Sequence, residues 1–227
     1  MTDAVLFDVD GTLVDSNDGH ARAWVAAFAE AGYQIPFERV RPLIGMGSDR
    51  ILPALVPGLS RDTEPGKTIA ARRARIFLER EVDHVHPTRG ARGLLEAVRR
   101  RGARVVVATS AKREELDVLL ARGGVADLVD VATTSDDASS SKPAPDIVVT
   151  ALEKAGVGPE RALFVGDTRY DVEAAHRAKL PCVALLCGGS TRADLAEAEA
   201  IYSDPAELTG ALDLPPFPWS STVSTMS

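Results

Sequence analysis

Short, continuous runs of apolar residues recur along the chain and predict the buried strands of a parallel sheet. The first run, Ala4-Val5-Leu6-Phe7, shows no alternation of apolar and polar residues, as expected for a strand that is covered on both faces. Later runs are rich in β-branched residues. The predicted strands are 4–7, 104–108, 128–132, 162–165 and 182–186.

Helical periodicity fills most of the sequence between these runs. Apolar residues recur at helical spacing between about residues 17 and 31, and Gly32 is expected to end that helix. Strands that alternate with helices are typical of right-handed βα units, so we predict an α/β fold with a Rossmann-like, doubly wound parallel sheet. Further helices are expected near 48–56, 63–83, 88–101, 112–122, 145–156 and 170–179, with breaks at Pro53, Pro57 and Pro65.

One long stretch breaks this alternation. After a single strand, the chain from about residue 16 to 86 is strand-poor and rich in Arg, Ala and Leu, which predicts an inserted helical domain. The expected domains are a sheet core from 1–16 and 87–212, a helical insert from 17–86, and a flexible tail from 213–227, where Pro, Ser and Thr replace periodic apolar residues.

Composition and charge narrow the class of protein. The 227 residues are 45% hydrophobic and 26% charged, as in an ordinary globular protein. A net charge of −7 disfavours nucleic acid and anionic membranes as partners. No apolar run approaches the roughly 18–20 residues of a membrane span, and the first residues lack the pattern of a signal peptide. We therefore expect a cytoplasmic protein that binds neither nucleic acid nor membrane.

The cysteines agree with that compartment. Cys182 and Cys187 are too few for a disulfide framework, and their spacing matches no metal site. We expect both to be thiols in core strands, as is usual in a reducing cytoplasm.

Acidic residues follow two of the predicted strands. The first strand ends in Asp8 and Asp10, and the strand at 162–165 is followed by Asp167 and Asp171. Ligands of open α/β sheets bind outside the carboxyl ends of the strands, so these carboxylates should share one crevice. They would repel one another there unless a hard cation such as Mg²⁺ lay between them. Each of them alone would be explained as a helix cap or turn residue, but the joint pattern favours a metal site.

Two further junctions on the same edge suit a phosphate group. Thr109 and Ser110 follow the strand at 104–108 and offer a hydroxyl and free backbone N–H groups at a helix start. Lys142 precedes a predicted helix, and Pro143 and Pro145 are expected to hold its segment extended. The crevice is thus expected to hold a metal ion and a phosphate together.

These segments, in this order along the chain, resemble the four motifs of the haloacid dehalogenase-like hydrolases. The resemblance covers residues 4 to about 205, and the D-x-D-G-T element is its most specific part. The helical insert resembles the small cap of phosphoglycolate phosphatase-like and β-phosphoglucomutase-like members. The matching segments are Asp8-Val9-Asp10-Gly11-Thr12-Leu13-Val14-Asp15-Ser16, Thr109, Lys142 and Gly166-Asp167-Thr168-Arg169-Tyr170-Asp171.

The resemblance implies hydrolysis of a small phosphorylated metabolite with Mg²⁺ as cofactor. Asp8 would be the nucleophile that forms an aspartyl-phosphate, and Asp10 the general acid–base, with its backbone carbonyl on the metal. Asp167 would bind the metal directly and Asp171 would order the metal's waters. The remaining roles fall to Thr109 and Ser110, which would donate hydrogen bonds to phosphate oxygens, and to Lys142, which would supply positive charge.

The same resemblance separates related reactions. Dehalogenases of the family lack an acid two residues after the nucleophile, so Asp10 excludes that reaction in favour of phosphate ester chemistry. Phosphonoacetaldehyde hydrolases need a cap lysine for a Schiff base and have a different first motif, and Lys67 is the one lysine between residues 16 and 86. A non-enzymatic binding module is disfavoured because every motif residue is present.

A sugar-phosphate mutase remains the alternative to a phosphatase. His20 and the segment Leu43-Ile44-Gly45-Met46-Gly47-Ser48 resemble the hinge helix and cap loop of β-phosphoglucomutases. The mutases, however, carry an arginine where Ser48 stands, and Arg50 would lie about 200° further round a helix. We expect Gly45, His20 and Arg50, with Ser110, to contact the substrate.

Simpler roles are open for several cap residues. Gly45 and Gly47 could merely form a turn, and His20 could be a packing histidine. The run Arg72-Arg73-Ala74-Arg75 is expected to be a solvated helix face, and Trp24 and Phe28 to be cap core. Phosphoglycolate, sugar phosphates, nucleotide monophosphates and polyol phosphates are all open as substrates, and a monomer is expected.

Overall fold

The sheet is parallel throughout, as predicted. The computed structural model describes residues 2–214, and its six-stranded sheet has the order β5-β4-β1-β6-β7-β8. Every neighbouring pair in that sheet is parallel. The strands are β1 (Ala4–Phe7), β4 (Arg104–Ala108), β5 (Val131–Thr133), β6 (Ala162–Gly166), β7 (Cys182–Leu185) and β8 (Ala200–Tyr202).

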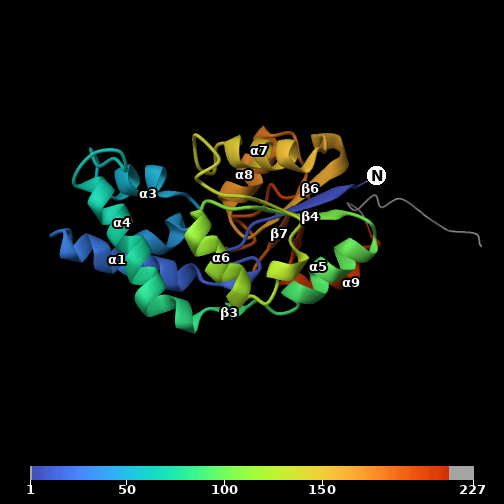
Figure 1. Ribbon diagram of the computed structural model, residues 1–227, viewed down its shortest axis with the longest axis horizontal. Helices are drawn as coiled ribbons and strands as arrows, with labels where there is room; N and C mark the ends of the chain where they lie inside the picture. The colour runs from blue at the N-terminus through green and yellow to red at the C-terminus, as the bar shows by residue number, and fades with distance from the viewer. Residues whose placement is uncertain (1, 215–227) are drawn as a thin grey trace, which may run out of the picture.

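Helices cover both faces of this sheet (Figure 1). The side chains of β1 alternate between two cores: Val5 and Phe7 pack in one, while Ala4 and Leu6 pack in the other. The first core contains residues of α5 (Ala91–Arg100), α6 (Arg113–Arg122) and α9 (Pro205–Ala211), and the second those of α7 (Asp146–Ala155) and α8 (Arg169–Arg177). A strand buried on both faces needs apolar residues at every position, which explains its continuous apolar run.

The helical insert lies at one end of the molecule (Figure 1), and we call it the cap. Trp24 and Phe28 are buried in it with their rings 5.6 Å apart, so their predicted place in the cap core is confirmed. Pro53 does not break its helix but lies inside it. The helices of the cap are α1 (Asn17–Glu30), α2 (Phe37–Val40), α3 (Ser48–Leu55) and α4 (Gly66–Ile76), with short helical turns at Arg41–Leu43, Phe77–Glu81 and Val82–His84.

A small antiparallel ribbon connects the cap to the core. It pairs β2 (Val14–Asp15) with β3 (His86–Pro87), so the two chain crossings lie side by side. Thr88 reinforces the junction, since its Oγ1 donates to the carbonyl of Thr12 at 2.7 Å. The chain thus enters and leaves the cap through this ribbon.

The sequence prediction was wrong in several short elements. The strand expected at 128–132 begins later, at Val131, because a 3₁₀ turn at Ala126–Leu128 precedes it. Strand β8 and helix α9 were not predicted, and they occupy chain that was assigned no element. The segment around Lys142, which was expected to be extended, is a turn closed by a hydrogen bond from the Ala144 N–H to the Ser141 carbonyl.

Other predictions concern the cysteines and the end of the chain. Cys182 is buried in β7, but Cys187 lies beyond that strand and is partly buried, with Sγ 3.2 Å from the Gly11 carbonyl oxygen. Both are free thiols. The tail predicted at 213–227 lies, from residue 215 onward, outside the described residues. Among residues 2–214, no helix is long and apolar enough to cross a membrane.

Candidate active site

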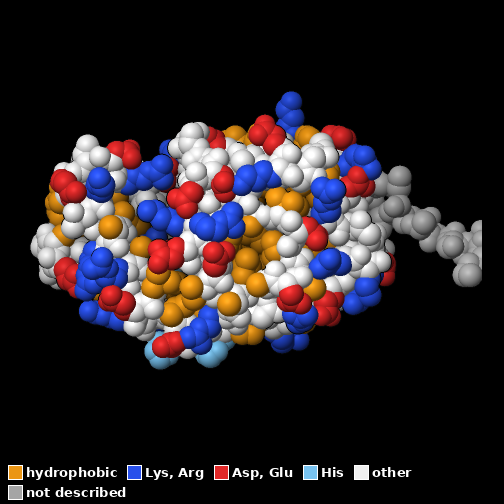
Figure 2. Space-filling view, in the orientation of Figure 1, with side chains coloured by type: hydrophobic (Ala, Val, Ile, Leu, Met, Phe, Trp, Pro, Cys, Tyr) orange, Lys and Arg blue, Asp and Glu red, His pale blue; other side chains and the backbone are white. Residues whose placement is uncertain are grey.

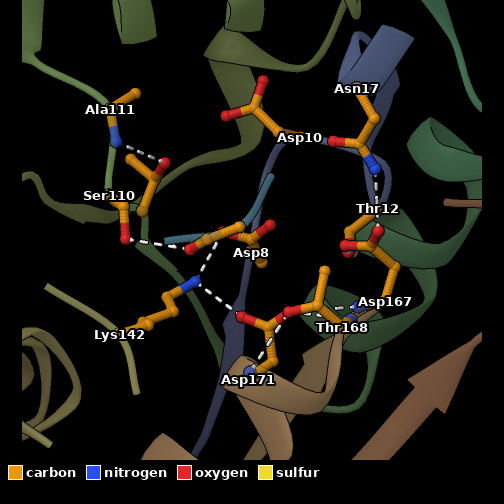
Figure 3. Close-up of polar contacts among 12 residues, drawn as sticks. Asp8, Asp10, Thr12, Asn17, Ser110, Ala111, Lys142, Asp167, Thr168 and Asp171 are labelled. Carbon is orange, nitrogen blue, oxygen red and sulfur yellow. Dashed lines mark hydrogen bonds and ion pairs between the residues drawn. The ribbon is translucent and has the colours of Figure 1, made fainter. Parts of the chain in front are cut away.

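The motif residues converge at the carboxyl edge of the sheet (Figure 3). Strands β4, β1 and β6 are neighbours, and their C-terminal ends are followed by Thr109, by Asp8 and by Asp167. Lys142 approaches the same place from the loop before α7. The predicted crevice is therefore formed by residues that lie far apart in sequence.

Lys142 bridges two of the acids. Its Nζ is 2.6 Å from Asp8 Oδ1 and 2.7 Å from Asp171 Oδ1, and its side chain has no exposed surface. Burial raises the pKa of Asp8 to about 7, and repulsion from Asp171 and Asp10 adds to this against the attraction of Lys142. Burial alone would lower the pKa of Lys142, but the two carboxylates outweigh it and raise that pKa. The ammonium is thus held in its charged form.

Three buried carboxylates meet beside this lysine. One oxygen each of Asp8, Asp167 and Asp171 lies within 4.8 Å of the others. Burial raises the pKa of Asp167 well above its usual value, and the charges of Asp171 and Asp8 raise it further. One ammonium cannot balance three carboxylates, and Asp8 Oδ2 is buried without a hydrogen-bond partner among the described residues. The donor set is all oxygen, which fits a hard divalent cation.

Asp167 is held tightly in place. Thr12 Oγ1 donates to its Oδ1 at 3.0 Å, and Asn17 Nδ2 donates to its Oδ2 at 2.9 Å. Gly11, with φ +78°, and Gly188 pass so close that a Cβ on either would lie within 2.2 Å of that Oδ2. Only glycine fits at these two positions, so the backbone of Gly11 and Gly188 packs directly against the Asp167 carboxylate.

Asp171 also caps helix α8, and this contact fixes the orientation of its carboxylate. Its Oδ2 accepts hydrogen bonds from the Thr168 N–H at 3.0 Å and the Thr168 hydroxyl at 2.7 Å. The two residues form the capping box of α8. With its Oδ1 on Lys142, Asp171 therefore orients the lysine and starts the helix at the same time.

Asp10 lies apart from the three clustered carboxylates. Its Oδ1 accepts from Ser16 Oγ at 2.5 Å and contacts His20 Nε2 at 2.8 Å. Burial would raise the pKa of Asp10, but His20, Ser16 and Arg73 outweigh it and lower that pKa. Figure 3 shows the Asp10 carboxylate turned away from those of Asp8, Asp167 and Asp171, and this geometry agrees with a role other than metal binding through its carboxylate.

The hydroxyl groups predicted to bind phosphate also lie at this edge. Thr109 is buried, and its Oγ1 accepts the Ala111 N–H at 3.0 Å, which leaves the hydroxyl hydrogen to donate elsewhere. Ser110 Oγ donates to the carbonyl of Gly45 in the cap at 3.2 Å. The two neighbours therefore differ, since one faces the site and the other also contacts the cap.

A cavity of about 420 Å³ lies between the core and the cap. Of the predicted substrate contacts, Ser110, Gly45 and His20 line it, as do Asp8, Asp10 and Thr109. Arg50 is not among its lining residues. Its side chain is about half exposed on α3 and pairs with Asp49, because two helical positions turn it away from the side on which Ser48 lines the cavity.

An ion pair between Arg73 and Glu115 in the cavity wall was not predicted from the sequence. Arg73 was expected on a solvated face, yet its Nη1 lies 2.9 and 3.1 Å from the two carboxylate oxygens of Glu115 on α6. The same nitrogen is 3.3 Å from His20 Nδ1, and the His20 ring stacks on Phe77 at 3.8 Å. A signal was present, because Ile69, Arg73 and Phe77 share one face of the helical segment and place a charge within its buried stripe.

The family is shown by comparison with known proteins. The family model described as haloacid dehalogenase-like hydrolase matches residues 5–185. The chain therefore belongs to the haloacid dehalogenase-like hydrolases and is an enzyme of that family, which confirms the resemblance of its motifs.

Two curated relatives illustrate the likeness. The chain is 30% identical over 236 residues to the phosphoglycolate phosphatase of Escherichia coli (strain K12), and the match covers 93% of this chain and 92% of that protein. It is 31% identical over 193 residues to the chloroplastic Protein SUPPRESSOR OF QUENCHING 1 of Arabidopsis thaliana. That match covers 80% of this chain but spans 18% of the longer plant protein.

Solved structures share the fold over nearly the whole chain. A hydrolase from Pseudomonas syringae is 29% identical, with a TM-score of 0.86 and coverage of 94% of this chain and 98% of that one. The β-phosphoglucomutase from Clostridium difficile superposes with a TM-score of 0.80 over 92% of this chain and 93% of that one. At 18% identity, this second likeness is one of fold alone.

Proposed function

We propose that the protein is a Mg²⁺-dependent phosphatase that hydrolyses a small phosphate monoester through an aspartyl-phosphate on Asp8. The observation that carries the proposal is the state of the Asp8 carboxylate. Asp8 lines the cavity, and its Oδ1 accepts a hydrogen bond from Lys142. Its Oδ2 is buried and has no hydrogen-bond partner among the described residues. Such an oxygen is available to attack phosphorus, and the nearby positive charge lowers the repulsion between carboxylate and phosphate.

The residues of this chain divide the two steps between them. In the first step an Asp8 oxygen bonds to phosphorus as the ester oxygen leaves, and Asp10 gives that oxygen a proton. In the second step Asp10 takes a proton from a water molecule, whose oxygen displaces the Asp8 carboxylate from phosphorus. Lys142 and the Thr109 hydroxyl hold the phosphoryl oxygens throughout. Proton transfer of this kind contributes about 10²–10⁴ in rate.

A divalent cation fits the site by the chemistry of its donors. The carboxylates of Asp8 and Asp167 would hold it, with the backbone carbonyl of Asp10 and water ordered by Asp171. Three buried carboxylates beside a single ammonium support this assignment. Bound Mg²⁺ would supply charge that offsets the repulsion between nucleophile and phosphate.

The size of the cavity and the relatives support a small substrate. A space of about 420 Å³ suits a metabolite and leaves little room for a polymer. The phosphoglycolate phosphatase relatives make phosphoglycolate the first candidate, and sugar, nucleotide and polyol monophosphates follow. Because the core and cap walls come from one chain, the site is complete in a monomer, and two free thiols agree with a reducing cytoplasm.

A mutase of the β-phosphoglucomutase type is the second candidate. It is favoured by cap cations at the cavity, since Arg61, Lys67 and Arg73 could hold the second phosphate of a bisphosphate. Against it, Glu115 already pairs with Arg73, and Arg50 does not reach the cavity. The two functions separate when glucose 1-phosphate is supplied with its bisphosphate, because a mutase isomerises the sugar and a phosphatase releases phosphate.

The decisive experiment is hydrolysis of p-nitrophenyl phosphate, followed by a panel of small phosphate esters. Turnover should require Mg²⁺ and stop with EDTA. Ca²⁺ should inhibit, because its larger and looser coordination shell misplaces nucleophile and phosphate. The Lys142→Met variant should lose activity, whereas Glu38→Gln, an exposed carboxylate of the cap, should not. Full activity of metal-free protein would contradict the assignment of the carboxylates.

A further inference from the structure

Residues 45–49, which lead into α3 and form its first turn, make three hydrogen bonds to one core residue, Ser141, besides the bond from Ser110 to the Gly45 carbonyl. Ser141 Oγ donates to Asp49 Oδ1 at 2.5 Å, and the Ser141 N–H donates to Asp49 Oδ2 at 3.3 Å. The Gly47 N–H donates to Ser141 Oγ at 3.0 Å. Ser141 is 2% exposed, so its N–H and its hydroxyl donate to the Asp49 carboxylate instead of to water. We call residues 45–49 the docking loop.

The two glycines of the docking loop are required by its approach to the core. A Cβ on Gly47 would lie 2.6 Å from the Cβ of Ser141, too close for any side chain. Gly45 has φ +108°, and a Cβ there would lie 2.9 Å from Thr168 Cγ2. A turn alone would explain Gly45 but not Gly47, whose φ is −82°. The loop is therefore shaped to fit against the core as well as to turn the chain.

The position of Ser141 gives this contact a chemical consequence. Ser141 directly precedes Lys142, the buried cation that contacts Asp8 and Asp171. Asp49 itself is not among the residues that line the cavity, whereas Gly47 and Ser48 are. Its carboxylate therefore serves the core segment and not the substrate.

We propose that Asp49 is a positioning residue that couples docking of the cap to the placement of Lys142. The inference rests on the proposed function only in giving Lys142 a role on the phosphoryl group. With the cap docked, Asp49 anchors the backbone one residue before the lysine. When the cap swings about its ribbon, Asp49 leaves, the Ser141 N–H and hydroxyl lose their partners, and the segment loosens. Phosphoryl transfer is then favoured only beneath a closed cap.

Hydrogen exchange tests the coupling without any reference to catalysis. Peptides covering residues 139–146 should exchange at least about tenfold faster in Asp49→Ala than in wild type, as expected for loss of hydrogen bonds to a charged group. Asp49→Asn, which keeps an acceptor, should lie between the two. Peptides covering β1 should not change. Glu38→Gln, with its exposed cap carboxylate, is the matched control and should exchange as wild type.

Kinetics with p-nitrophenyl phosphate and Mg²⁺ provide the second readout. Asp49→Ala and Ser141→Ala should each lower kcat about tenfold with a smaller change in KM, and the double variant should lose no more than either single variant. A purely structural contact would lower Tm and leave the kcat of the folded protein unchanged, which would overturn the proposal. Additive losses, or unchanged exchange at 139–146, would overturn it too.

The design distinguishes this inference from the proposed function. If Lys142→Met kept wild-type kcat, the proposed function would fail, while faster exchange after Asp49→Ala would still support the coupling of cap and segment. If Lys142→Met were inactive and exchange did not respond to Asp49, the proposed function would stand and the coupling would be wrong.

Discussion

At the scale of single residues, the fold makes the carboxylate of Asp8 unfavourable to ionise. It is buried, and repulsion from Asp171 and Asp10 adds to the cost of ionising it, so its pKa rises to about 7 despite Lys142. In the unfolded chain the same group would titrate near 3.8. Between about pH 4 and pH 7 the folded protein therefore holds a proton that the unfolded chain has released. Without metal, the free energy of unfolding should fall as pH rises through that window.

The Asp8→Asn variant tests this argument. Its amide does not ionise, so in EDTA its Tm should exceed that of wild type at pH 8, and the difference should shrink toward pH 5. Added Mg²⁺ should raise the Tm of wild type more than that of the variant, because a ligand stabilises the state that binds it.

Turnover by the Asp8→Asn variant should fall by several orders of magnitude relative to wild type. An identical pH dependence of Tm in both proteins, or a tenth of wild-type activity, would contradict the role of Asp8.

Asp10 should behave differently from Asp8 when it is changed. Asp10→Asn keeps the nucleophile but removes the group expected to deprotonate water, so a phosphoenzyme formed from an activated ester should accumulate. Rapid quench with a ³²P-labelled activated phosphate monoester measures it, and Asp8→Asn, which cannot form it, is the blank. Hydrolysis of the phosphoenzyme at the wild-type rate would exclude Asp10 as the base.

At the scale of elements, helix α4 of the cap meets helix α6 of the core through one buried ion pair. Arg73 and Glu115 have side chains that are 14% and 2% exposed. Removing one partner leaves a buried charge uncompensated, which costs about 3–5 kcal/mol, whereas removing both costs less. Arg73→Met should therefore destabilise the protein strongly, and the double variant Arg73→Met with Glu115→Gln should recover much of the loss.

Denaturant unfolding of the four proteins in this cycle measures the coupling between the two residues. The exposed pair of Arg92 and Asp127 offers a matched control, since surface pairs contribute about 0–1 kcal/mol. Equal and additive losses for both pairs would mean that the buried pair does not bind cap to core.

The elements also show which parts of the structure the sequence could predict. Strands such as β1 are apolar at every position, and acids follow their ends, so the local pattern located both the sheet and the cluster of acids at its carboxyl edge. Strand β8 has three residues, all of them partly buried, and is too short to stand out as an apolar run; α9 is a short helix with a start signal, Asp204 followed by Pro205, that was not used. Helical spacing could have indicated that Arg73 is buried, but its partner Glu115, like the contact of Asp49 with Ser141, depends on how the cap packs against the core, which no local pattern encodes.

At the scale of the whole molecule, charge and shape agree with a small-molecule enzyme. On the face in Figure 2, basic and acidic side chains intermingle over core and cap, and that face shows no extended basic surface of the kind that nucleic acid requires. The candidate site lies in the cavity between cap and core, where the core supplies the carboxylates and the cap supplies His20 and the docking loop. From this division we predict that phosphate chemistry belongs to the core and choice of leaving group to the cap.

Removal of the cap tests that division in one step. Asp15 and His86 are paired neighbours in the ribbon, so residues 18–84 can be replaced by a short Gly-Ser linker without stretching the core. Asn17 remains to hold Asp167, whereas the contacts of His20 with Asp10 and of Asp49 with Ser141 are lost. The capless protein should keep its metal site, turn over more slowly, admit bulkier esters and lose its preference among small ones. The measurement is kcat/KM across a panel of phosphate esters for both proteins, with circular dichroism and Mg²⁺-dependent Tm to show that the core is folded. An unchanged rank order of substrates in a folded capless protein would assign specificity to the core, because every side chain of the cap would then be dispensable for it.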